Sequence, residues 1–293
     1  MMGSKYLLED DDVRRELWRN TIQLFHQYKR PGFIGPFKAA GFDEYRVEPY
    51  VLLSGTGKEK TPDIIASGKN GWLVLELSFD KKSKEDTLNF YKQIDPRYLG
   101  NYNLPVHDNQ PEIVMSRLED FIPDGPYCKI TVKDKLKVKD EEYINNLTLR
   151  EELKKASGSD LRKLPEIPIT LLPEMKSQEI RRGLIELVMQ IFDPDSDGKD
   201  PVELVDAGLE RLSDKINIAS KRRLIKNVTD EMAVLMTNEY LSDYLTIDEE
   251  TSKYKATDKF KQHHKTRMHI VSKLSEWAGI GPQTTLYDIK QRP

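Results

Sequence analysis

Residues 61–80, TPDIIASGKNGWLVLELSFD, decide the fold of the first half of the chain. The stretch predicts a hairpin, with strands at 63–67 and 72–79 around the turn Gly68–Gly71. From Trp72 to Leu77 the second strand is apolar except for Glu76. A continuous apolar run is typical of a central strand that is covered on both faces. The hairpin therefore predicts the middle of a sheet.

Helices and strands are expected in mixed order on either side of this hairpin. Apolar spacing and turn residues predict helices at 13–29, 84–94 and 140–156, and further strands at 45–54, 112–115 and 127–132. The order helix, strand, hairpin, helix, strand, strand implies an α/β domain, with a mixed central sheet flanked by helices, over residues 1–158.

The second half of the chain is predicted to be mostly helical. Residues 159–175 form the expected linker, because Ser157-Gly158-Ser159 stands at their start and the stretch Pro165–Pro173 contains several prolines. Over 176–293 the pattern predicts helices at 177–192, 201–212, 220–241 and 258–278, with a two-stranded hairpin at 244–247 and 254–257.

Composition limits the classes of protein that the chain can represent. Its 293 residues suffice for two domains, and 46 basic against 49 acidic residues give a net charge of −3, with no global basic surface for nucleic acid. The single cysteine, Cys128, excludes an internal disulfide or a multi-cysteine zinc site and is expected to be a buried apolar residue. Without a signal peptide or a long apolar run, we expect a cytoplasmic protein without membrane contact.

Asp63 and Glu76 are the strongest candidates for a functional site. An acidic residue inside an apolar central strand is costly unless it is paired or bound to a metal. Strand alternation puts Glu76 and Ser78 on one face, and carboxylates on one side of a rigid sheet suit Mg²⁺. The alternatives are structural: Asp63 as a strand-start residue after Pro62, and Glu76 as the partner of a buried Arg46.

The Pro62-Asp63 and Glu76-Leu77-Ser78 motif, on a strand–turn–strand followed by a helix bearing Gln93, resembles the PD-(D/E)xK nucleases. The resemblance covers roughly the first half of the chain and implies a restriction-endonuclease-like fold and a Mg²⁺-dependent or Mn²⁺-dependent DNA endonuclease. It implies that Asp63 and Glu76 ligate the metal, together with a strand carbonyl expected from Leu77, and that Glu16 on the first helix joins the site.

Ser78 departs from the family motif, which has a lysine at this position. A serine hydroxyl can bind water but carries no positive charge. Lys81, Lys82 and Lys84 follow within a few residues, and a catalytic lysine relocated among them, with Lys82 as the candidate, would restore the charge. The alternative is a catalytically degenerate nuclease fold that binds DNA or a protein.

A basic cluster marks the start of the helix predicted at 220–241. The order of three helices and a two-stranded hairpin resembles winged-helix domains, which place their third helix in the DNA major groove. The resemblance implies phosphate contacts from Lys221, Arg222, Arg223 and Lys226. The cluster is also compatible with a solvated helix face, or with a module that docks a partner protein or a second copy of the chain.

Two further charged segments have structural interpretations. The lysines at alternate positions in residues 129–140, KITVKDKLKVKD, are expected to protect a sheet edge, although they could also follow a phosphate backbone. The acidic segment 193–200 begins like a calcium loop but has Leu204 at the position of the final acidic ligand. We expect Asp200 to cap the helix that follows.

Overall fold

The computed structural model describes residues 3–78, 85–119, 125–193, 195–239, 241–260 and 264–280. They form two compact units: Met1–Ile167 with Lys215–Asn217, and Pro168–Asp214 with Ile218–Pro293. Within the described ranges, no helix is both long enough and apolar enough to span a membrane.

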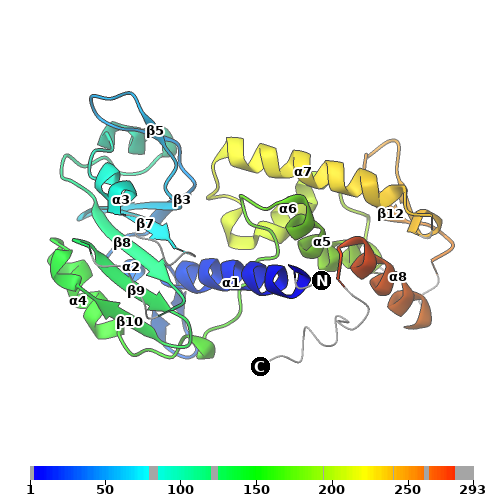
Figure 1. Ribbon diagram of the computed structural model, residues 1–293, viewed down its shortest axis with the longest axis horizontal. Helices are drawn as coiled ribbons and strands as arrows, with labels where there is room; N and C mark the ends of the chain where they lie inside the picture. The colour runs from blue at the N-terminus through cyan, green and yellow to red at the C-terminus, as the bar shows by residue number, and fades with distance from the viewer. Residues whose placement is uncertain are drawn as a thin grey trace. The chain divides into compact units, whose positions relative to one another are not determined.

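A six-stranded mixed sheet forms the centre of the first unit (Figure 1). Its strands are β3 (Glu44–Val47), β6 (Ile64–Gly68), β7 (Gly71–Leu77), β8 (Glu112–Arg117), β9 (Cys128–Val132) and β10 (Leu136–Lys139). They lie in the order β10-β9-β8-β7-β6-β3, with β7, β8 and β9 parallel and the other neighbours antiparallel. The expected mixed α/β architecture is confirmed.

The hairpin predicted at residues 63–79 is present as β6 and β7. Gly68 pairs with Gly71, so Lys69 and Asn70 form a two-residue turn. Gly71 has a φ of 137°, a conformation that L side chains rarely adopt. Every residue of β7 is buried, as expected for a central strand.

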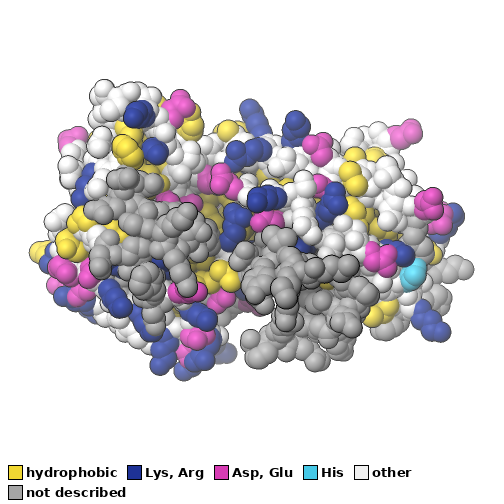
Figure 2. Space-filling view, in the orientation of Figure 1, with side chains coloured by type: hydrophobic (Ala, Val, Ile, Leu, Met, Phe, Trp, Pro, Cys, Tyr) yellow, Lys and Arg dark blue, Asp and Glu magenta, His cyan; other side chains and the backbone are white. Residues whose placement is uncertain are grey.

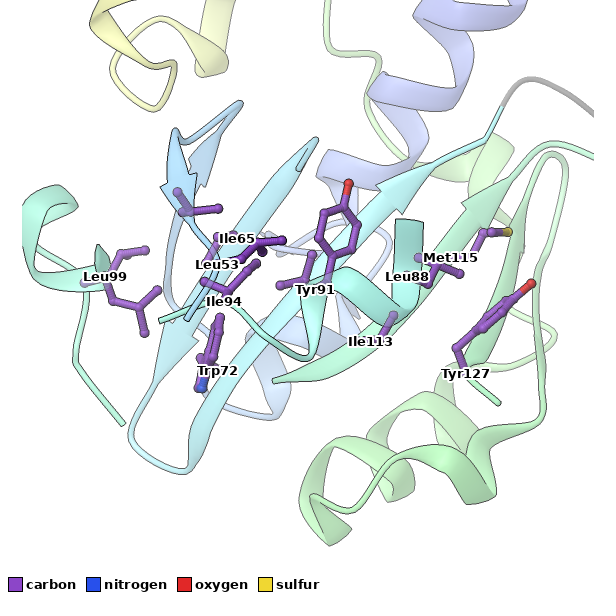
Figure 3. Packing of buried hydrophobic residues seen from close by; sticks show 13 residues of the cluster. Leu53, Ile65, Trp72, Leu88, Tyr91, Ile94, Leu99, Ile113, Met115 and Tyr127 are labelled. Carbon is purple, nitrogen blue, oxygen red and sulfur yellow. The ribbon is translucent and has the colours of Figure 1, made fainter. Parts of the chain in front are cut away.

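One face of the sheet packs against the helix α3 (Glu85–Tyr91) and the 3₁₀ helix η1 (Pro96–Tyr102). Ile65, Trp72 and Met115 lie on the sheet side of this apolar cluster, and Leu88 and Tyr91 come from α3 (Figure 3). Since residues two apart along a strand share a face, Glu76 lies on the same face as Trp72.

The opposite face is covered by α1 (Gly3–Gln23). The hydroxyls of Thr21 and Ser116 are 2.8 Å apart, and Ser116 alternates with Met115 along β8. This helix ends at Gln23 rather than at residue 29, because the chain then forms the short pair β1 (Gln27–Tyr28) and β2 (Phe33–Ile34). The remaining helices of the first unit are α2 (Pro36–Ala39), η2 (Glu141–Tyr143), α4 (Leu147–Ala156) and η3 (Leu161–Lys163).

The strand predicted at 45–54 is two strands. After β3 the chain turns at Glu48, which has a φ of 48°, and continues as β4 (Val51–Leu52), which pairs with β5 (Glu59–Lys60). Pro49 explains the interruption, since proline has no N–H to donate to a strand ladder.

A segment from late in the sequence completes the first unit. The Val47 N–H donates to the Lys215 carbonyl at 2.9 Å, and the Asn217 N–H donates to the Val47 carbonyl at 3.0 Å. Ile216 thereby forms a parallel bridge with Val47, at the outer side of β3. The first unit is therefore discontinuous in sequence.

The second unit is mostly helical, as predicted. Its elements are α5 (Ser177–Ile191), α6 (Pro201–Leu209), η4 (Glu210–Leu212), α7 (Ile218–Met236), η5 (Leu241–Asp243), β11 (Leu245–Ile247), β12 (Tyr254–Ala256) and α8 (His264–Trp277). β11 and β12 pair, and Lys199 adds a bridge to Tyr254. Asp200 caps α6, as predicted: its carboxylate accepts from the Glu203 N–H at 2.8 Å, and Glu203 accepts from the Asp200 N–H at 2.9 Å.

Candidate active site

Asp63 and Glu76 lie at the open end of the β6–β7 hairpin. Ile64 pairs with Leu75, so the next position outward sets Asp63 opposite Glu76, with both side chains on one face of the sheet. Asp63 is half-buried, and its Oδ2 accepts the Leu77 N–H at 2.6 Å. The hydrogen bond across the strands fixes the position of the Asp63 carboxylate.

Glu76 is 7% exposed and accepts a hydrogen bond from a tyrosine. The Tyr91 hydroxyl donates to Glu76 Oε2 at 2.7 Å, and Figure 3 shows this ring extending from α3 with its hydroxyl pointing away from the apolar cluster. Burial, the charge of Glu76 and its hydrogen bond, and the charge of Asp63 all raise the pKa of Tyr91. The charges of both carboxylates therefore act on the Tyr91 hydroxyl. This agrees with the strand register, which places Asp63 and Glu76 next to each other.

Arg46 is not the partner of Glu76. Its guanidinium donates to the Tyr45 carbonyl at 2.8 Å and lies 3.7 Å from the Glu44 carboxylate. Asp63, by contrast, directly precedes β6, so its position fits both a strand-start residue and a ligand.

Ser78 continues the pairing of β7 with β8. Its N–H donates to the Ser116 carbonyl at 3.0 Å, and the residue is 3% exposed. Alternation places its side chain on the face of Glu76. Lys81, Lys82 and Lys84 lie outside the described residues.

Glu16 lies on α1 and is half-buried. The contact between Thr21 and Ser116 places α1 on the face of the sheet opposite to Glu76. Glu16 therefore belongs to a helix on one face of the sheet, whereas Tyr91 belongs to a helix on the other face.

The oxygen atoms of Asp63 and Glu76 are the type of ligand that a hard cation prefers. Two carboxylates supply oxygen ligands, which Mg²⁺ and Mn²⁺ prefer, and the predicted third donor, Leu77, is the residue whose N–H bonds Asp63. Within the described part of the chain, no group of three or more His, Cys, Asp or Glu side chains is placed to hold a metal ion. Among the described residues, the further ligands of an ion here would be main-chain groups, with water or substrate completing its coordination.

Two further residues at this end of the sheet were not identified from the sequence. Tyr91 holds Glu76, and Arg117, 3% exposed, lies on β8. Leu77 pairs with Ser116, so Arg117 is the neighbour of Ser78 across the strands. The alternation of EIVMSR in β8 was the available signal for Arg117, whereas Tyr91 depends on how α3 crosses the sheet.

The basic cluster of α7 divides in two. Lys221 is half-buried: its ammonium pairs with Asp206 and lies 3.0 Å from the Ser213 hydroxyl. Although burial opposes it, the hydrogen bonds that Asp206 accepts from Lys221 and Ser213 lower the pKa of Asp206. Arg222, Arg223 and Lys226 are exposed, with Arg223 3.8 Å from Glu174. Figure 2 shows Lys and Arg side chains gathered over this helix.

Other polar groups have structural roles. Lys137 and Lys139 are exposed on the edge strand β10, as expected for protection of a sheet edge, whereas Lys129 is buried and pairs with Asp140. Cys128 is buried, as predicted, and burial raises the pKa of its thiol.

No family model matches the sequence, and no curated protein or solved structure matches the chain.

Proposed function

We propose that this protein is a metal-dependent DNA endonuclease whose site is formed by Asp63 and Glu76. The observation that carries the proposal is the pairing of these two residues across β6 and β7, on one face of the sheet. Two ionised carboxylates brought together in a largely buried position repel each other and lose hydration. A bound divalent cation relieves both costs.

The residues around the two carboxylates position them for such a role. The Leu77 N–H holds Asp63, and the Tyr91 hydroxyl holds one oxygen of Glu76. A bound Mg²⁺ or Mn²⁺ would polarise a phosphate and lower the pKa of an attacking water. Ser78 offers a hydroxyl on the same face, which can hydrogen-bond a water molecule.

The order of elements supports a restriction-endonuclease-like interpretation of the first unit. The sequence pattern predicts helix, strand, hairpin, helix, strand and strand, and these elements are present as α1, β3, the β6–β7 hairpin, α3, β8 and β9. The carboxylates occupy the two strands of the hairpin, and Trp72 begins the apolar strand that carries Glu76.

The second unit supports DNA as the substrate. Three helices, α5, α6 and α7, precede the β11–β12 hairpin in the order of a winged helix, and Lys199 adds a strand position beside β12. Arg222, Arg223 and Lys226 are exposed within about one turn of α7, so one phosphate can interact with several of them.

A plasmid-nicking assay with Mg²⁺ or Mn²⁺ tests the proposal, with Asp63→Ala as the control. Nicking by the wild-type protein that disappears in Asp63→Ala and in EDTA is the expected result. Alanine variants of Lys81, Lys82 and Lys84 should then identify a relocated lysine by a loss of roughly a hundredfold or more, as expected for removal of a charge stabiliser.

Ser78, in place of the family lysine, favours a second candidate function. A nuclease-derived scaffold would keep the exposed basic cluster of α7 and bind DNA or a partner protein without cutting. Such a protein would shift DNA in a binding assay but leave a plasmid intact with either metal, and Asp63→Ala would bind DNA as tightly as the wild type.

A further inference from the structure

We propose that Arg117 adds, from the neighbouring strand, a buried positive charge to the Asp63–Glu76 site, separate from any relocated lysine. The inference rests on the proposed cation site and adds a residue to it. Because Arg117 is almost fully buried, we assign it a positioning and charge-balancing role rather than direct contact with substrate.

The register of the parallel strands places Arg117 at the site. Glu76 pairs with Met115 and Leu77 with Ser116, so Arg117 lies beside Ser78. Met115 belongs to the apolar cluster that also contains Tyr91, and Arg117 follows it by two residues. Arg117, Glu76 and Asp63 therefore share one face, on three neighbouring strands roughly 4.8 Å apart.

Burial gives the charge of Arg117 its importance. Arginine stays protonated in proteins, so a guanidinium that is 3% exposed carries its full charge within the fold. A buried cation is costly unless negative groups lie within reach, and a pair of facing carboxylates is costly unless a positive group is near. An arginine side chain is long enough to cross the roughly 4.8 Å between neighbouring strands, so Glu76 lies within its reach.

Two other buried or half-buried cations of this face have different partners. Lys129, on the next strand, pairs with Asp140 and lies over the Tyr127 ring. Arg46, on β3, bonds the Tyr45 carbonyl and lies near Glu44. Arg117, by contrast, is a buried cation on β8, the strand that pairs with the Glu76 strand β7.

The proposed role predicts an unusual combination of effects. Arg117→Met removes the charge but keeps most of the apolar stem. A fixed positive charge repels a divalent cation, so the variant should bind Mn²⁺ several-fold more tightly at about pH 8. It should also nick plasmid DNA roughly tenfold or more slowly, because a charge that stabilises the transition state is gone. A purely structural role predicts weaker cation binding together with slower cleavage.

The experiment combines Mn²⁺ titration calorimetry, plasmid nicking and thermal unfolding on the full chain. Arg117→Lys keeps the charge and should match the wild type in cation affinity. Arg117→Gln provides a second neutral variant if Arg117→Met does not fold. Lys129→Met is the matched control: it removes a buried cation from the same face and should lower stability without tightening Mn²⁺ binding.

The outcomes separate this inference from the endonuclease proposal. If the wild type binds Mn²⁺ but does not cut DNA, the endonuclease proposal fails, and the titration alone still tests Arg117. Equal Mn²⁺ affinity in the wild type and the neutral variants would overturn the charge-balancing role. So would weaker binding in those variants, or an absence of Mn²⁺ binding by the wild type.

Discussion

The two units of this protein use charge in opposite ways. At the end of the β6–β7 hairpin, charged side chains are buried or half-buried and accept defined hydrogen bonds, such as that from Tyr91 to Glu76. Along α7, Arg222, Arg223 and Lys226 are exposed to water. A buried charge interacts strongly, so removing its partner costs much free energy. The interactions of an exposed charge are screened by water and salt, so several such charges are needed for a large effect. Single substitutions should therefore have large effects in the sheet and small ones on the helix.

The largest effect is expected at Glu76. Glu76→Gln should abolish the heat of Mn²⁺ binding and lower plasmid nicking by roughly a hundredfold or more, because a neutral amide is a poor ligand for a hard cation. Calorimetric titration and a nicking assay measure the two losses.

Glu112 is the matched control for Glu76. It is an equally buried glutamate on the adjacent strand, and its carboxylate accepts the N–H groups of Asn145 and Asn146 at 3.0 and 2.8 Å. Glu112→Gln should cost about 1–3 kcal/mol of stability but leave Mn²⁺ binding intact. Equal loss of Mn²⁺ binding in Glu76→Gln and Glu112→Gln would mean that both substitutions damage the sheet generally. Glu76 would then have no specific role in cation binding.

Tyr91→Phe should have the next largest effect. Removing the hydroxyl takes away the hydrogen bond that the buried Glu76 accepts from Tyr91, at a cost of about 1–3 kcal/mol. Since the folded pKa of Tyr91 is raised, its contribution to stability is complete below the unfolded pKa of about 10 and is lost as pH rises above it. Urea unfolding at about pH 8 and about pH 10.5 should show a smaller alkaline loss in the variant than in the wild type. An unchanged difference between the two pH values would contradict the buried hydrogen bond.

The exposed cluster on α7 should respond in graded steps. DNA affinity should fall with salt with a log–log slope near −0.9 per phosphate contact, and neutralising Arg222, Arg223 or Lys226 should flatten that slope by about one unit each. Lys221→Gln is the internal control, because its ammonium pairs with Asp206 and should affect stability more than the slope. Fluorescence anisotropy across a salt series measures each slope. Identical slopes in all variants would favour a protein-docking role for this helix.

The smallest effect is expected at the β11–β12 turn. The Asp248 carboxylate accepts from the Lys255 ammonium at 2.7 Å and from the Thr251 N–H at 2.9 Å, and these bonds hold the pKa of Asp248 far below its usual range. Its contribution is present above its unfolded pKa of about 4 and lost as pH falls. Asp248→Asn should speed amide exchange at Thr251 several-fold, with global stability almost unchanged. Unchanged exchange would mean that the turn does not depend on this charge.

The sequence was most informative where local rules act alone. The β6–β7 hairpin follows from an apolar run and a glycine turn, and the cap of α6 follows from Asp200 and Glu203 three residues apart. The division of the predicted strand at residues 45–54 could have been inferred from Pro49. The end of α1 at Gln23 could not, because apolar residues continue to Tyr28 and serve the β1–β2 pair instead.

The candidate site was only partly predictable for a different reason. Asp63 and Glu76 stand out because polar residues beside apolar strands are conspicuous. Strand alternation could have placed Arg117 on the face of Met115, whereas nothing local in the sequence specifies where α3 packs and therefore where Tyr91 lies. The ion pair between Lys221 and Asp206 could not be predicted from the sequence either, because it joins two different helices, α7 and α6.

The segment Lys215–Asn217 has a consequence for the order in which the protein forms during synthesis. The outer edge of β3 is bonded at Val47 by residues made long after the rest of the sheet. At a translation rate of about 5–20 residues per second, the ribosome exposes the sheet strands on the order of ten seconds before Asn217 emerges. During that time the edge is open to pairing with other chains. A nascent chain ending near residue 167 should therefore aggregate more readily than one ending after residue 217, and sedimentation of stalled ribosome–nascent-chain complexes can compare the two.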